Sequence, residues 1–88
     1  MEIFVYIIYS KSSDVYYKGI STDVNRRLEE HNLGKSRYTS GKGIWTLVYL
    51  ELMADKRSAL IREKQIKRLN RCSVESLLRQ PQNLLLVK

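Results

Sequence analysis

A continuous run of β-branched and aromatic residues near the N-terminus constrains the fold of this chain most strongly. Ile3 to Tyr9 reads Ile-Phe-Val-Tyr-Ile-Ile-Tyr, and neither of its two alternating sets of side chains carries a charge. Such runs are typical of strands that are buried on both faces. We therefore predict a strand that lies inside a sheet, with helices covering the sheet.

A second strand is predicted directly after this run. The polar segment from Ser10 to Asp14 indicates a turn, and Val15 to Ile20 resumes the strand pattern. Two strands joined by a short polar segment predict a hairpin. Because side chains alternate between the faces of a strand, Tyr6 belongs to one face of the first strand, and Tyr17 and Gly19 share one face of the second.

A helix is predicted over Asp23 to Leu33. Hydroxyl and acidic residues at positions 21–23 favour a helix start, and Gly34 favours a helix end. The spacing i, i+3, i+4, i+7 places four residues on one inward stripe of this helix: Val24, Arg27, Leu28 and His31.

The segment from Gly34 to Gly43 follows this helix and holds three glycines and three cations around one aromatic residue. That composition predicts an exposed, mobile loop. Its cations, Lys35, Arg37 and Lys42, are candidates for contact with phosphate.

The C-terminal half completes an α+β (mixed α/β) pattern. Ile44 to Leu52 predicts a third strand, and Asp55 to about Arg71 predicts a second long helix. A shorter helix starts near Ser73 and should end by Pro81, while the apolar tail Leu84 to Val87 has no predicted place. The order β-β-α-β-α-α predicts a small, three-stranded, mainly antiparallel sheet flanked by helices. We expect one domain over residues 1–80 and a tail over 81–88.

The charge balance favours a polyanionic partner. Sixteen Lys and Arg against nine Asp and Glu give a formal charge of +7, and a basic surface gains affinity for nucleic acid by counterion release.

Cys72 is the only cysteine, which excludes an internal disulfide and fits a reducing compartment. Ile3 to Tyr9 is far shorter than the roughly 20 apolar residues that span a bilayer and lacks a basic leader. We expect a cytoplasmic protein without a membrane segment; its oligomeric state is left open.

Ionisable side chains lie on the predicted inward stripes of both long helices. Arg27 and His31 share the stripe of the first helix, and Glu63 lies among apolar residues of the second. Because an unpaired buried charge is costly, such residues are usually paired or functional. One interpretation is an Arg27–Glu63 ion pair that only stabilises the fold, with Tyr17 as an ordinary core aromatic. The other interpretation is an active site.

The order and spacing of five elements resemble the motifs of the GIY-YIG endonuclease superfamily. Val5-Tyr6-Ile7 is followed by Tyr17-Lys18-Gly19 and then by Arg27, His31 and Glu63. These elements cover most of the chain, and their joint spacing is more specific than any one of them. The chain is similar to small single-domain bacterial members and, more distantly, to the first nuclease module of nucleotide-excision repair proteins. It departs from the pattern in reading Val-Tyr-Ile for Gly-Ile-Tyr and in having Lys18 where isoleucine is common.

The resemblance implies roles for both tyrosines. Tyr6 would be the general base or lie close to it, although a phenol with an ordinary pKa of about 10 needs nearby positive charge, a metal or a relay to serve. His31, where several members have tyrosine, is suited to such a relay. Tyr17 would hold the scissile phosphate or the attacking water. Gly19 would leave room for the backbone to approach the substrate.

The resemblance also assigns the charged residues. Arg27 would place its planar fork of donors on the phosphate in the transition state. Glu63 would be the single protein ligand of Mg²⁺ or Mn²⁺, which water and phosphate oxygens would complete. Lys67, close to Glu63 on the same helix, is either a phosphate contact or a solvated lysine.

Three functional hypotheses follow. The first is a metal-dependent endonuclease that hydrolyses a phosphodiester by water attack at a single-metal site, with DNA, including structured or branched DNA, or RNA as its substrate. The second is a non-catalytic or weakly catalytic basic nucleic-acid-binding module, for which phosphate contacts alone supply affinity. The third is an interaction domain whose partner packs on the tail from Leu84 to Val87.

Overall fold

A three-stranded antiparallel sheet forms the centre of the structure. The computed structural model describes residues 2–35 and 37–86. Strands β1 (Ile3–Ser10), β2 (Val15–Ser21) and β3 (Trp45–Met53) lie in the order β2-β1-β3, and β1 pairs antiparallel with both neighbours. The N-terminal run therefore forms the central strand. The predicted α+β fold is confirmed.

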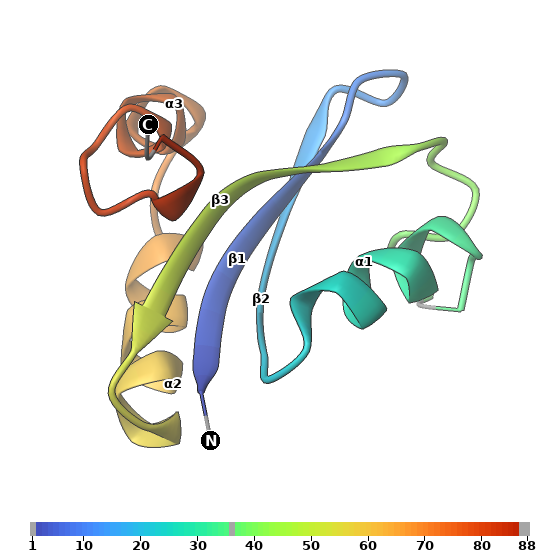
Figure 1. The fold of residues 1–88 in the computed structure, drawn as a ribbon. Coiled ribbons are helices and arrows are strands. Elements are labelled where there is room, and N and C mark those ends of the chain that lie inside the picture. Colours follow the sequence, from blue (N-terminus) through green and yellow to red (C-terminus); the bar gives the residue numbers. More distant parts are fainter. Residues whose placement is uncertain (1, 36, 87–88) are drawn as a thin grey trace.

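Helices cover both faces of this sheet, as Figure 1 shows. Helix α1 (Val24–Asn32) lies on one side, and helices α2 (Lys56–Lys67) and α3 (Arg71–Leu78) lie on the other. Alternate residues of β1 enter different cores. Val5 and Ile7 pack in the cluster under α2 and α3, whereas Tyr6 and Ile8 pack with residues of α1 and β3. The burial of β1 on both faces, which its sequence predicts, is confirmed.

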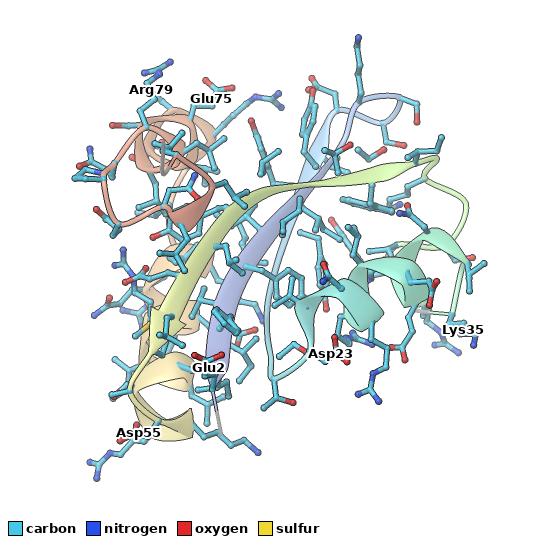
Figure 2. All side chains as sticks on the ribbon, in the orientation of Figure 1. Glu2, Asp23, Lys35, Asp55, Glu75 and Arg79 are labelled. Atoms are coloured by element: carbon cyan, nitrogen blue, oxygen red, sulfur yellow. The ribbon has the colours of Figure 1, made fainter. Side chains whose placement is uncertain are left out.

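Helix α1 is fixed at both ends by the signals seen in the sequence. The carboxylate of Asp23 accepts a hydrogen bond from the backbone N–H of Arg26 at 3.1 Å, and Figure 2 labels Asp23 at this end of α1. Gly34 has a φ of 76°, so it adopts the left-handed conformation that ends many helices. The N–H groups of Gly34 and Lys35 donate to the carbonyls of His31 and Glu30, which satisfies two of the last carbonyls of α1.

The second long helix is shorter than predicted. A helix continuing to Arg71 is wrong, because α2 ends at Lys67 and α3 begins at Arg71. Asn70 separates the two: its side chain accepts from the N–H of Ser73 at 2.9 Å and so caps α3. The capping bond stabilises a new helix start, so the chain turns there instead of extending α2.

The segment after α3 folds back onto β3 through one buried residue, Asn83, which is 1% exposed. Its amide nitrogen donates to the carbonyl of Val48 at 3.1 Å, and its amide oxygen accepts from the N–H of Leu50 at 3.2 Å. A short 3-10 helix, η1 (Leu84–Leu86), follows, and Val87 lies outside the described residues. In the part of the chain that the structure describes, no helix has the length and apolar character needed to cross a bilayer.

Candidate active site

The candidate site begins where the ring of Tyr6 crosses over Gly19. These two residues are direct partners in the β1–β2 register. A Cβ atom at Gly19 would lie 2.7 Å from the Tyr6 hydroxyl and 2.8 Å from Cζ, well inside the roughly 3.5 to 4.0 Å of an ordinary carbon contact. Only glycine therefore lets the buried Tyr6 ring lie across β2. Gly19 serves the placement of this ring, and the backbone approach to substrate that the resemblance implied stays a prediction.

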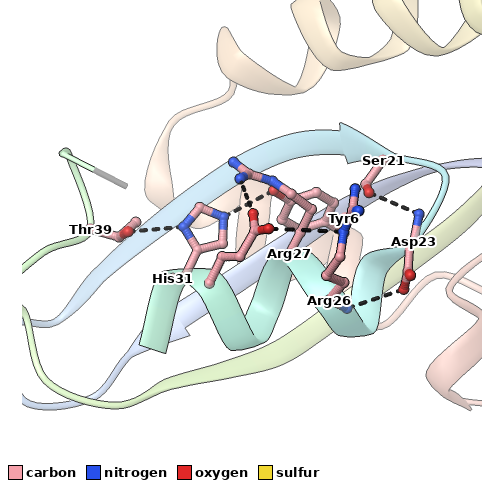
Figure 3. A network of polar contacts seen from close by, with 8 residues as sticks. Tyr6, Ser21, Asp23, Arg26, Arg27, His31 and Thr39 are labelled. Atoms are coloured by element: carbon pink, nitrogen blue, oxygen red, sulfur yellow. Dashed lines mark hydrogen bonds and ion pairs between the residues drawn. The ribbon is translucent and has the colours of Figure 1, made fainter. Parts of the chain in front are cut away.

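The Tyr6 hydroxyl is the first member of a buried polar chain, drawn in Figure 3. It lies 3.1 Å from Nε2 of His31, and Nδ1 of His31 lies 2.9 Å from Oγ1 of Thr39. All three residues are 1% exposed. Because a neutral imidazole has one donor and one acceptor nitrogen, the chain can be ordered in either direction with both ring nitrogens satisfied.

Thr39 also anchors the loop that follows α1. Its predicted exposure is wrong at Thr39, whose carbonyl also accepts from the indole nitrogen of Trp45 at 3.1 Å. Near the other end of the loop, the carbonyl of Lys42 accepts from the hydroxyls of Ser12 and Ser13 at 3.0 and 3.1 Å. These bonds hold the loop against the sheet, because the carbonyls of Thr39 and Lys42 accept hydrogen bonds from Trp45 on β3 and from the serines of the β1–β2 turn.

Burial sets the protonation states of the buried pair. The pKa of Tyr6 is raised, mainly by burial, although a hydrogen-bonding contact with the Arg27 guanidinium and its charge partly oppose the shift. The pKa of His31 is lowered, first by burial and second by the positive charge of Arg27. At neutral pH the site therefore pairs a protonated phenol with a neutral imidazole.

Arg27 lies at the edge of this chain, with about a third of its side chain exposed. Its guanidinium donates to Glu30 at 2.7 Å and forms the contact with Tyr6 that lowers the pKa of the phenol. The structural alternative, an Arg27–Glu63 ion pair, is wrong: Arg27 pairs with Glu30, and Glu63 pairs with Lys67 at 3.3 Å.

Glu63 reaches the site from the opposite helix layer. Its side chain is 17% exposed, and its negative charge is close enough to contribute to the raised pKa of Tyr6, after burial and the other causes. Among residues 2–35 and 37–86, no three His, Cys, Asp or Glu side chains come together as metal ligands. One carboxylate fits Mg²⁺ or Mn²⁺ only when water and phosphate oxygens complete the shell, which is how magnesium is commonly held with phosphate substrates.

Tyr17 connects the buried chain to the surface. Its ring centroid lies 4.8 Å from that of His31 and 5.6 Å from that of Tyr38. Tyr17 also packs against the apolar core beside α1, so it is a core aromatic and a neighbour of the candidate site at once. A shallow groove of about 220 Å³ opens beside it, lined by Tyr16, Tyr17, Lys18, Tyr38 and Lys67.

The predicted phosphate-binding cations fall into two groups. Lys67 lines this groove, and the ammonium of Lys42 lies 5.3 Å from the centre of the Tyr38 ring. Lys35 and Arg37 are exposed on the loop and do not line this groove. The structure thus brings Lys42 and Lys67 to the site, while the roles of Lys35 and Arg37 stay predictions.

Sequence reasoning missed Thr39 and Tyr38, which the structure brings to the site. Thr39 gave no periodic signal because it lies in a glycine-rich segment. Tyr38 was the single aromatic residue among the loop cations, and aromatic residues interleaved with cations are a known signal of nucleic-acid contact.

The chain is similar to known proteins of one family. A family model described as the GIY-YIG catalytic domain matches residues 2–75. A UPF0213 protein of Halobacterium salinarum is 43% identical over 74 residues, which cover 83% of this chain and 95% of the relative. One of Pectobacterium carotovorum is 46% identical over 70 residues, covering 77% and 71%. The NMR structure of a UPF0213 protein from Bacillus halodurans is 34% identical and superposes with a TM-score of 0.60 over 97% of this chain and 90% of that one. The chain therefore belongs to the GIY-YIG catalytic domain family.

Proposed function

We propose that this protein is an endonuclease that hydrolyses a nucleic-acid phosphodiester, DNA in the first place, by water attack assisted by one divalent metal ion. The convergence of charged and polar groups on the Tyr6 hydroxyl carries the proposal. His31 lies 3.1 Å from that hydroxyl, and the charges of Arg27 on α1 and Glu63 on α2 act in opposite directions on the pKa of the phenol. Membership of a catalytic nuclease family supports the same reaction class.

Accessibility divides the roles among the residues. Tyr17 and Arg27 are partly exposed, whereas Tyr6 and His31 are 1% exposed. We assign the contact with the phosphate to Arg27, whose planar donors suit the charge that develops on the phosphate oxygens. We assign the orientation of the attacking water to Tyr17.

The buried pair supplies a proton acceptor behind these groups. As the attacking water is deprotonated, Tyr6 would pass its phenol proton to Nε2 of neutral His31 along their 3.1 Å contact and take the water proton on its oxygen, which leaves hydroxide, a neutral phenol and an imidazolium. The charge of Arg27 stabilises the phenolate of Tyr6 but opposes the imidazolium of His31, so negative charge from the bound phosphate would be needed to favour the relay. Thr39 holds the imidazole in place from its other nitrogen.

Glu63 would hold the metal ion, which, when bound, supplies charge stabilisation at the phosphate and the leaving oxygen. Because the metal is completed by phosphate oxygens, metal and substrate should bind cooperatively. The ammonium of Lys67, at 3.3 Å, neutralises the Glu63 carboxylate in the free protein.

The test is cleavage of supercoiled plasmid, branched DNA and structured RNA with Mg²⁺ or Mn²⁺. Arg27→Ala should lower the cleavage rate by roughly 10²- to 10³-fold, as for the loss of one transition-state donor. Arg26→Ala is the matched control, because Arg26 lies on the same helix, also pairs with Glu30 and is 65% exposed.

Glu63→Gln should abolish metal-dependent cleavage, and Glu75→Gln, which removes an exposed carboxylate paired with Arg71, should not. If wild type and both site variants cleave equally, the assigned site is wrong. If nothing is cleaved while all of the proteins bind nucleic acid, the protein is the binding module of the second hypothesis.

A further inference from the structure

The groove beside Tyr17 runs along the open edge of the sheet. Strand β2 is an edge strand in the order β2-β1-β3, and among the described residues no strand pairs with its outer side. The groove walls come from three segments: Tyr16 to Lys18 on β2, Tyr38 on the loop after α1, and Lys67 on α2. A ligand in the groove would therefore touch both helix layers at once.

Two cations, Lys18 and Lys67, line this groove. Lys67 pairs with Glu63 at 3.3 Å, whereas Lys18 forms no ion pair within the described part of the chain. The pKa of Lys18 is lowered, first by burial and second by the positive charge of Lys67. Two cations held this close in the free protein favour an anion between them, because a bound phosphate would relieve their repulsion.

An exposed aromatic ring stands over the same groove. Tyr38 is 54% exposed, which is unusual for a side chain with so much apolar surface. Its centroid lies 5.6 Å from that of Tyr17 at an interplanar angle of 32°, and the ammonium of Lys42 lies 5.3 Å from the ring centre. A stacked base would replace the long, flexible Lys42 side chain on the ring, and Tyr17 would support the ring. The groove volume of about 220 Å³ is below the roughly 300 to 1,000 Å³ of sites for drug-sized ligands. That size suits one planar ring.

We propose that this groove is a binding subsite for one unpaired nucleotide next to the scissile bond, with its base stacked on Tyr38 and its phosphate between Lys18 and Lys67. The combination of a stacking ring with cations that follow the backbone is how proteins hold single strands. A base inside a duplex presents only its edges, so it cannot stack on Tyr38. The subsite rests on the proposed function for its ligand class, and it specifies which structure of nucleic acid that function requires.

The experiment measures binding without cleavage. Fluorescence anisotropy in EDTA compares a labelled single-stranded oligonucleotide, DNA in one arm and RNA in the other, with a blunt DNA duplex of the same sequence. Wild type should prefer a single strand in at least one arm. Tyr38→Ala should weaken that binding by roughly 5- to 150-fold, the effect of losing one stacked base, whereas Tyr38→Phe should retain it.

Matched variants separate the subsite from general effects. Ile44→Ala removes another exposed apolar side chain, at 80% exposure and outside the groove, and should leave affinity unchanged. Lys18→Ala and Lys67→Ala should each reduce the slope of the logarithm of the binding constant against the logarithm of salt concentration by the amount expected for about one phosphate contact. Lys64→Ala, on the same helix as Lys67 but outside the groove, should not.

Two outcomes would overturn the subsite: tighter binding of the blunt duplex than of either single strand, or equal single-strand affinity for wild type and a folded Tyr38→Ala. Because the assay contains no metal, its result is independent of turnover. A protein that cleaves duplex DNA but ignores Tyr38 keeps the proposed function and loses the subsite. A protein that binds single strands through Tyr38 but never cleaves loses the proposed function alone.

Discussion

Gly19→Ala should destabilise the protein although it adds only one methyl group to a strand. The new Cβ would lie 2.8 Å from Cζ of Tyr6, about 0.7 Å inside an ordinary carbon contact. Tyr6 is 1% exposed and contacts His31, so its ring cannot swing away freely. Overpacking of this kind costs about 1 to 3 kcal/mol, and the better strand preference of alanine returns roughly 0.5 to 1 kcal/mol.

From the middle of each range, the net effect should be a loss of about 1 kcal/mol, which lowers the midpoint of thermal unfolding by roughly 4 to 8 °C in a domain of this size. Circular dichroism gives the midpoint, and NMR of the single His31 ring reports whether its contact with Tyr6 survives. In a Tyr6→Leu background the same substitution should cost less, because the clashing ring is absent. Unchanged stability and an unchanged His31 signal in the single variant would refute this account of Gly19.

Three further predictions concern the buried polar residues. The pKa of His31 is lowered in the fold, chiefly by burial, so the unfolded chain binds the proton more tightly. The stability that neutral His31 contributes is complete above its unfolded pKa of about 6.5 and is lost as pH falls through the lower folded value. The urea concentration at the unfolding midpoint should therefore decrease in wild type when the pH is lowered from about 7.5 to about 5.5. It should change less in His31→Gln. Thr39→Val removes the hydroxyl beside His31 Nδ1 and should cost about 1 to 3 kcal/mol in urea unfolding, whereas Thr39→Ser should recover most of the loss; equal effects would contradict the contact. Asn83→Ala removes the amide that bonds Val48 and Leu50 and should cost about 2 to 4 kcal/mol, measured against the exposed control Gln82→Ala.

The parts of the fold that periodic patterns control could be predicted. The apolar run of β1 indicated a strand covered on both faces, and alternation placed Tyr17 and Gly19 on one face of β2. The register that pairs Tyr6 with Gly19 came only from the structure. The 3.6-residue spacing likewise turned His31 inward on α1, where it is 1% exposed. In both elements, the repeated pattern of several residues fixes which side chains face the core, so no single residue decides it.

Single-residue hydrogen bonds were beyond such reasoning. The break between α2 and α3 depends on the side chain of Asn70, which accepts from the N–H of Ser73; the residue types allow this cap, but an unbroken helix satisfies the same pattern. Thr39 and Asn83 are polar residues in segments without periodicity, and their burial depends on acceptors and donors that come together only in the folded chain. The assignment of chemistry needed the family motifs, because spacing alone equally allowed an Arg27–Glu63 ion pair.

The amide of Asn83 also has a consequence for how copies of this protein behave in concentrated solution. It occupies the carbonyl of Val48 and the N–H of Leu50, two backbone groups of the sheet's β3 margin that could otherwise recruit a strand from another molecule. One side chain thus acts as a short substitute strand and protects this part of the β3 margin from pairing with another molecule. Loss of the segment that carries it would turn a stable margin of the sheet into a template for aggregation.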